Sequence, residues 1–159
     1  MAGERATLGA GRETLPVPQH HIVATPPPFD QPPYPADIFA GQTVLVTGGG
    51  SGMGLAMAKA FAQGGAQVAV MGRSIERAEE GAAQIAALGV RVHAMSCDVR
   101  QPEAIAAAFD EAERELGPIG LLANNAGANF PILAEDISPN AWNAVTRIAI
   151  DGTFLCSAE

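Results

Sequence analysis

The chain has 159 residues, a formal net charge of −8 at pH 7 and 48% hydrophobic residues, enough sequence for one domain with a buried core. The acidic balance argues against a nucleic-acid-binding surface, no apolar stretch approaches the ~18 residues of a membrane span, and the N-terminus has no signal-peptide layout. The two cysteines and three histidines show no metal-ligand spacing, so we expect no metal site, and Cys97 and Cys156 as small buried thiols of a soluble cytoplasmic protein.

Residues 1–40 form a proline-rich N-terminal segment, densest in ATPPPFDQPPYPADIF (residues 24–39). Proline fixes φ and removes a backbone donor, so we expect an extended arm, partly disordered, ahead of a domain at residues 41–159. Two interpretations stay open for this arm, a leader that lies along the protein surface and a polyproline ligand for a partner.

The domain opens with two strand-and-helix pairs. The apolar run TVLVT predicts a strand over residues 43–47, and helical periodicity follows over residues 52–64. AQVAVM predicts a second strand over residues 66–71. Ser74 is then placed to cap a helix that begins at Ile75 and ends at Gly89.

The same alternation continues toward the C-terminus. VRVHAM predicts a strand over residues 90–95, Pro102 opens a helix that ends before Gly117-Pro118, and IGLLA predicts a strand over residues 119–123. Ser138-Pro139 opens a last helix. Strands that alternate with helices form right-handed βαβ units, so the sequence predicts an α/β fold with a parallel sheet covered by helices on both faces.

Five glycines fall within the seven residues 48–54, between the first predicted strand and its helix. In that position glycine permits a tight turn, close approach of a pyrophosphate to the backbone and close packing of the helix on the strand. The N–H groups of the helix start would meet the phosphates. The alternative is a merely flexible turn, which the strand–turn–helix context disfavours.

Three stretches together resemble the short-chain dehydrogenase/reductase family. Thr47-Gly48-x-x-x-Gly52-x-Gly54 has the family's glycine spacing, Cys97-Asp98-Val99 matches the Asp-Val after its third strand, and Asn124-Asn125-Ala126-Gly127 matches its signature after the fourth. The resemblance covers residues 41–159 and implies an oxidoreductase with a Rossmann-type doubly wound parallel sheet, here incomplete. It also implies that Asp98 meets the adenine amino group of the cofactor. The cofactor-binding residues that it implies are Thr47, Gly48, Ser51, Gly52, Met53, Gly54, Asp98, Val99, Asn125, Ala126 and Gly127.

The residues at the end of the second predicted strand indicate whether the cofactor is NAD or NADP. An NAD-selective site places Asp or Glu there, but this chain has Gly72 followed by Arg73. Arginine pairs with a 2′-phosphate, which an acid would repel, so we predict NADP (NADPH), held by Arg73 and also within reach of Arg100. The alternative for each arginine is a solvated surface position.

The stretch NNAGANFPILAEDISPNAWNAVTRIAIDGTF (residues 124–154) resembles the 2,4-dienoyl-CoA reductases within that family. The resemblance implies an acyl-CoA thioester substrate from the β-oxidation of unsaturated fatty acids. It gives Asn129 a catalytic hydrogen bond to the thioester carbonyl, and it places Phe130 and Ser138 against the substrate. Most other members have a catalytic Asn where this chain has Ala149, a departure that the dienoyl-CoA reductases share.

The family's Tyr-x-x-x-Lys pair is absent, because the one tyrosine, Tyr34, lies in the arm and the one lysine, Lys59, in the first predicted helix. The chain therefore resembles the front half of a reductase that is expected to be a homo-oligomer when complete. Two alternatives remain open, a 3-oxoacyl or alcohol-type reductase and a non-catalytic dinucleotide-binding fragment. We expect a half-sheet that ends in an apolar helix to expose a surface needing cover.

Overall fold

The computed structural model describes residues 34–159. The predicted proline-rich arm falls mostly outside these residues, so its role stays a prediction. At the start of the described part, Tyr34, Phe39 and Phe61 stack edge to face, with ring centroids 6.1 and 5.1 Å apart. This aromatic group attaches residues 34–42 to the first helix.

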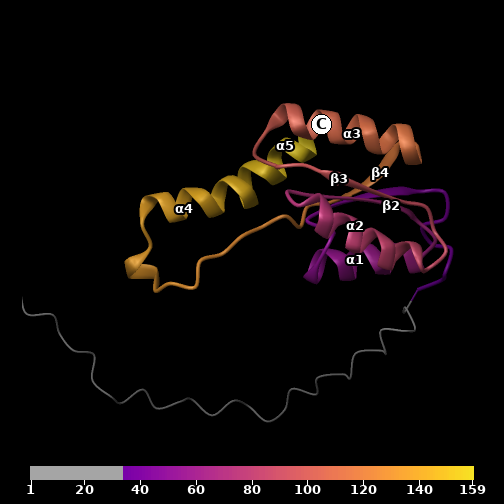
Figure 1. Ribbon diagram of the computed structural model, residues 1–159, viewed down its shortest axis with the longest axis horizontal. Coiled ribbons are helices and arrows are strands. Elements are labelled where there is room, and N and C mark those ends of the chain that lie inside the picture. Colours follow the sequence, from indigo (N-terminus) through magenta and orange to yellow (C-terminus); the bar gives the residue numbers. More distant parts are fainter. Residues whose placement is uncertain (1–33) are drawn as a thin grey trace, which may run out of the picture.

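The centre of the fold is a parallel sheet of four strands in the order β3-β2-β1-β4. Figure 1 shows the strands between helices above and helices below them. The strands are β1 (Thr43–Thr47), β2 (Gln67–Gly72), β3 (Val92–Ser96) and β4 (Ile119–Ala123). The α/β fold class is thereby confirmed. β1 lies between two neighbours and is buried along its whole length, whereas β4 is an edge strand and is half exposed.

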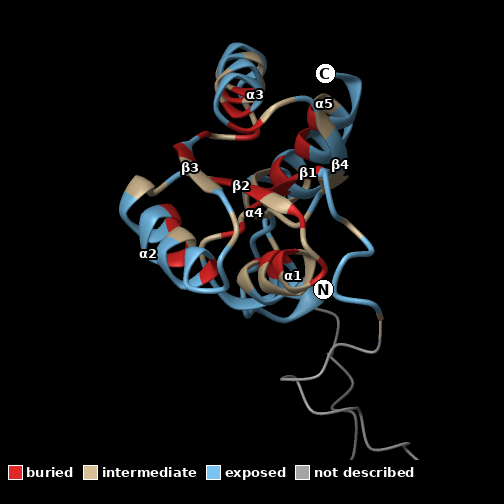
Figure 2. Cartoon of the chain, turned by 90° about the vertical axis from the view of Figure 1, so that its right-hand side faces the viewer, coloured by how far each residue is buried: buried red, intermediate tan, exposed pale blue. Residues whose placement is uncertain are grey.

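Helices cover both faces of the sheet, and Figure 2 shows the buried residues where they meet it. On one face, α1 (Gly52–Gln63) and α2 (Ile75–Ala86) pack on the valines of β1 and β2. On the other face, α3 (Pro102–Leu116) and α5 (Gly152–Ala158) pack on a second cluster that includes Leu45 and Met71. Each face has a continuous apolar core, as expected for a doubly wound sheet.

The helix starts that the sequence predicts at Ser74 and Pro102 are present. Ser74 caps α2 by accepting a hydrogen bond from the backbone N–H of Arg77 at 3.3 Å. Pro102 begins α3, and Gly117, with φ of 91°, ends it. The buried positions of α3 are Ile105, Ala108, Ala112 and Leu116, while Phe109 is only partly buried against the core.

The last predicted helix is divided into three parts. α4 (Pro139–Thr146) begins at Ser138, whose Oγ accepts from the N–H of Ala141 at 3.2 Å. A π-helical turn, η2 (Arg147–Asp151), follows and leads into α5. π-turns of this kind are frequent at functional sites. A short 3₁₀ turn, η1 (Ala134–Asp136), precedes α4 on the long connection from β4.

In Figure 1, α4 projects from the domain, whereas α5 lies beside α3. Several apolar side chains of this C-terminal segment are exposed. Ile150 is 62% exposed and Phe154 69% exposed, as expected for an uncovered apolar face. Ile148, by contrast, is buried, and Leu155 is half-buried against the core beneath α3. Among residues 34–159, no helix combines the length and apolar character needed to cross a bilayer.

Candidate functional site

A cavity of about 690 Å³ opens at the carboxyl ends of the strands. The strand order reverses there, because β2 and β4 leave β1 on opposite sides, and open α/β sheets bind ligands at such a point. Four successive strand-to-helix connections contribute to its wall, together with the π-turn. The lining residues are Gly48, Gly50, Ser51, Met53, Gly54, Met71, Gly72, Arg73, Ser74, Arg77, Ala78, Cys97, Asp98, Val99, Asn125, Ala126, Gly127, Ala128, Asn129 and Ile148.

The glycine-rich loop needs its glycines for geometry. Gly48 and Gly52 have φ of 66° and 54°, a region that side chains disfavour. A Cβ on Gly54 would contact the carbonyl oxygen of Gly48, so α1 can lie this close to the loop only without a side chain there. The loop is fixed to the sheet by the N–H of Gly48, which donates to Met71 O at 2.7 Å.

The start of α1 is suited to an anion. Its N-cap, Ser51, makes no side-chain capping hydrogen bond, and the first turn holds no acidic residue. The free N–H groups and the positive end of the helix dipole therefore face the cavity beside Gly54. A loop this tight against an uncapped helix start fits the pyrophosphate of a dinucleotide.

A hydrogen-bond network joins β1 to the loop after β4. The Thr47 hydroxyl accepts from the N–H of Asn125 at 2.9 Å and from the N–H of Ala126 at 2.8 Å. The Asn125 side chain donates to Thr47 O at 3.0 Å and to Gly48 O at 3.3 Å. These bonds hold the two walls of the cavity together.

An ion pair lies in the connection that follows β3. The Arg100 guanidinium donates to both carboxylate oxygens of Asp98, with Nε–O distances of 2.9 and 3.1 Å. These hydrogen bonds, with a smaller contribution from the charge of Arg73, lower the pKa of Asp98. Asp98 lines the cavity, whereas Arg100 does not.

The structure brings most of the predicted site residues together, and places the others around the cavity. Thr47 and Gly52 shape the loop without lining the cavity, Phe130 is 50% exposed outside it, and Ser138 caps α4. The roles predicted for all of them remain predictions.

Sequence reasoning missed several lining residues, and among them Arg77 carries a charge. The signal available was its position, four residues after Arg73 in the first turn of the helix that follows β2. The single tyrosine and single lysine lie elsewhere. Tyr34 donates to Ala60 O at 2.7 Å and Lys59 donates to Gln84 Oε1 at 2.8 Å.

Both cysteines are free and buried in the cluster beneath α3 and α5. Burial raises the pKa of the Cys97 thiol to about 11, with a smaller effect from Cys156, and raises the pKa of the Cys156 thiol to about 11 as well. Among residues 34–159, no group of three or more His, Cys, Asp or Glu side chains is placed to hold a metal ion.

We expect both thiols to resist alkylation in the folded chain at pH 8, with rates about a hundredfold below those of the unfolded chain, because the thiolate is the reactive form. A raised folded-state pKa also means that their contribution to stability is complete below pH 9.0 and falls as the pH rises toward about 11. Alkylation with and without urea measures the first effect, and urea unfolding across this pH range measures the second. Equal alkylation rates in the folded and unfolded chain would contradict the buried placement.

Comparison with known proteins agrees with this geometry. The family model described as short chain dehydrogenase matches residues 42–159. The chain is 42% identical over 116 residues to the Bacillus subtilis (strain 168) protein named "Probable 2,4-dienoyl-CoA reductase [(2E)-enoyl-CoA-producing]", covering 73% of this chain and 46% of that protein. It is 40% identical over 119 residues to the peroxisomal 2,4-dienoyl-CoA reductase of Rattus norvegicus, covering 74% and 41%.

Solved structures show the same fold. The 3-ketoacyl-(acyl-carrier-protein) reductase of Brucella melitensis, in complex with NADH, superimposes with a TM-score of 0.69 at 32% identity, over 75% of this chain and 48% of that one. The chain spans about half the length of the curated relatives that it matches. The matched residues contain both the glycine-rich loop and the Asn125 network, so the chain belongs to the short chain dehydrogenase family.

Proposed function

We propose that this chain is the cofactor-binding part of an NADPH-dependent reductase that acts on 2,4-dienoyl-CoA thioesters in the β-oxidation of unsaturated fatty acids. The observation that carries the proposal is that the glycine-rich loop, Arg73 and Asn129 all line one cavity. The relatives named 2,4-dienoyl-CoA reductase support the substrate class.

The residues of the cavity fit such a cofactor. The glycine-rich loop and the start of α1 would hold the pyrophosphate, and Asp98 would accept from the adenine amino group. No acid stands at the end of β2, where Gly72 leaves open space and Arg73 follows. Arg73 would pair with the 2′-phosphate. Arg100 would contribute there only if it left Asp98.

The substrate would lie beyond the loop after β4. The chemistry that bound NADPH would supply is hydride transfer to the conjugated thioester, which would place negative charge on the thioester carbonyl oxygen. The Asn129 amide would donate a hydrogen bond to that oxygen and stabilise the charge. Phe130 would pack on the nicotinamide and the acyl chain, and Ser138 would border the substrate while capping α4.

The remaining parts of the proposal concern the whole protein. We infer a proline-rich arm at residues 1–40 ahead of a Rossmann domain that begins at residue 41, a cytoplasmic location, and assembly as a homo-oligomer in the complete enzyme. The exposed Ile150 and Phe154 are consistent with such assembly.

A second candidate is a 3-oxoacyl or alcohol-type reductase. It is favoured by the likeness to the Brucella melitensis 3-ketoacyl reductase, which also holds NADH. Ala149 argues against it, because the amide side chain of the usual catalytic Asn is missing from the π-turn. Binding of NADPH without turnover would instead favour a non-catalytic dinucleotide-binding protein.

The reading frame beyond codon 159 and an activity assay together test the proposal. The proposal is supported if the frame continues into Ser and Tyr-x-x-x-Lys and if the protein that it encodes oxidises NADPH in the presence of 2,4-hexadienoyl-CoA. Preference for a 3-oxoacyl thioester would favour the second candidate.

Cofactor selectivity gives a separate prediction. We expect Arg73→Gln to weaken NADPH binding about tenfold, the loss expected for one charge-assisted phosphate contact, and to leave NADH binding within about twofold. Isothermal titration calorimetry measures both. Arg114→Gln removes the same charge on α3, outside the cavity, and serves as the control. Equal losses for the two cofactors in the Arg73 variant would overturn the assignment.

A further inference from the structure

We propose that Met53 is an oxidation site of this chain, at which a hydroperoxide converts the thioether into a sulfoxide and thereby weakens dinucleotide binding in the cavity. The step is a two-electron oxidation of the sulfur by hydrogen peroxide, in which the O–O bond breaks, one oxygen atom forms a bond to sulfur and one water molecule leaves. The oxidation is a property of the side chain itself, and its effect on binding rests on the proposed function.

The first argument is exposure. Met53 is 79% exposed and Met57 is 37% exposed, whereas Met71 and Met95 are buried in the core beneath α3 and α5. A peroxide reaches a thioether from solvent, so the two methionines of α1 should react before the two of the sheet. These four side chains are the methionines of residues 34–159, and they form a graded series within one protein.

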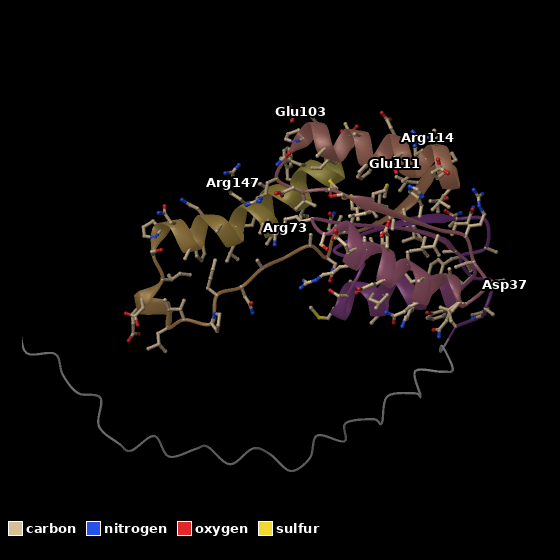
Figure 3. All side chains as sticks on the ribbon, in the orientation of Figure 1. Asp37, Arg73, Glu103, Glu111, Arg114 and Arg147 are labelled. Atoms are coloured by element: carbon tan, nitrogen blue, oxygen red, sulfur yellow. The ribbon has the colours of Figure 1, made fainter. Side chains whose placement is uncertain are left out.

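The second argument is the place of Met53 in the site. It is the second residue of α1, and it lines the cavity beside Ser51 and Gly54. Met57 lies one turn further along α1 and does not line the cavity. Figure 3 shows Arg73, which lines the same cavity, near the connection that leads from β4 toward α4. Met53 borders the cavity from α1, on the part of its wall that solvent reaches most freely.

The third argument is the chemistry of a sulfoxide at this position. Ser51 makes no side-chain capping hydrogen bond, so the N–H groups at the start of α1 remain for the pyrophosphate. A thioether sulfur is only a weak acceptor. A sulfoxide oxygen carries a negative partial charge and accepts hydrogen bonds, and the positive end of the helix dipole attracts it. The sulfoxide would therefore compete with the pyrophosphate for the same N–H groups and repel its negative charge.

A dinucleotide in the cavity would in turn shield Met53 from the peroxide. It would cover the start of α1 and leave Met57 in solvent, because Met57 lies outside the cavity. Oxidation and binding should thus oppose each other at Met53, and Met57 provides the matched position on the same helix.

The test treats the 159-residue chain, Met53→Leu and Met57→Leu with hydrogen peroxide and follows each methionine by peptide mass mapping. Leucine has nearly the same volume and forms no sulfoxide. We expect Met53 to be oxidised at least about tenfold faster than Met71 and Met95. NADP⁺ should slow the oxidation of Met53 and leave the rate at Met57 unchanged.

Calorimetric titration with NADPH, before treatment and after removal of the peroxide, measures the consequence. We expect the oxidised parent chain and the oxidised Met57→Leu chain to lose about tenfold in affinity, as for the loss of one hydrogen bond to a charged group. The Met53→Leu chain, compared with its own untreated affinity, should lose less than about twofold. It retains Cys97 and Cys156, so it also controls for oxidation of the thiols. Methionine sulfoxide reductase should restore the affinity of the parent chain.

The outcomes separate this inference from the proposed function. If Met53 reacts no faster than Met71, or if its sulfoxide forms and the affinity for NADPH is unchanged, the inference is overturned and the proposed function stands. An equal loss of affinity in the Met53→Leu chain, or thermal unfolding that shows the oxidised parent chain to be unfolded, also overturns it. If the untreated parent chain binds no NADPH, the proposed dinucleotide site falls and the inference falls with it.

Discussion

Replacing Gly54 by alanine is expected to abolish measurable binding of a nicotinamide dinucleotide and to destabilise the fold. The added Cβ would contact Gly48 O, would lie 2.5 Å from Asn125 Nδ2 and 2.9 Å from Gly48 C. Two of these atoms belong to the loop backbone, so either α1 or the loop must move. We expect a loss of about 2–3 kcal/mol in the free energy of unfolding from overpacking, and a loss of about a hundredfold or more in cofactor affinity from the displaced N–H groups. Urea unfolding and calorimetric titration with NADPH measure the two effects.

Gly72→Ala is the matched control for stability. Gly72 lines the same cavity, but a Cβ there meets no protein atom within 4 Å. Its unfolding free energy should stay within about 0.5 kcal/mol of the parent value. If Gly54→Ala bound NADPH with parental affinity, the close packing of α1 on the loop would not be what positions the phosphate site.

The second large effect is expected for Thr47→Val. Thr47 is 1% exposed, and its hydroxyl accepts from two backbone N–H groups, those of Asn125 and Ala126. Valine keeps the shape but cannot accept, so two donors at the cavity wall lose their partner. Each partly buried donor left unpaired costs about 1–3 kcal/mol, and we expect a total loss of about 2–3 kcal/mol in the free energy of unfolding, with weaker NADPH binding.

Thr47→Ser separates the hydroxyl from the methyl group. Serine retains the acceptor and removes one methyl, so its loss should be about 1 kcal/mol. Urea unfolding of the three proteins gives both values. Similar destabilisation by serine and valine would assign the role of Thr47 to packing and remove the hydroxyl from the argument.

The fold could be predicted because its signals are local. β1 and β2 each contain a continuous apolar run, residues 44–46 and 68–71, as is typical of strands buried on both faces, and Ser74 and Pro102 mark helix starts by their own chemistry. The division of the last helix could not be predicted. A π-turn depends on which side chains must reach the core, here Ile148 within the turn and Cys156 in α5 after it, and α3 and the sheet determine that choice.

Some residues of the candidate site could likewise be predicted from the sequence, and others could not. The glycine-rich loop, Asp98 and the Asn125 segment follow strand ends, and parallel strands bring their carboxyl ends to one edge. Arg77 escaped prediction because its place depends on the contact between Gly50 and Gly81, two glycines separated by α1, β2 and the first half of α2. The pairing of Arg100 with Asp98 was equally out of reach, since it depends on side-chain conformation two residues apart.

The central place of β1 also bears on synthesis of the chain. β1 pairs with β2 through Thr43 and Gln67, but its other side pairs only with β4, beginning at Ile119. At roughly 5–20 residues per second, the ribosome adds the intervening segment over several seconds. During that time TVLVT, which carries no charge, is an open hydrophobic edge. We therefore expect chaperones to bind the nascent chain until β4 emerges from the ribosome.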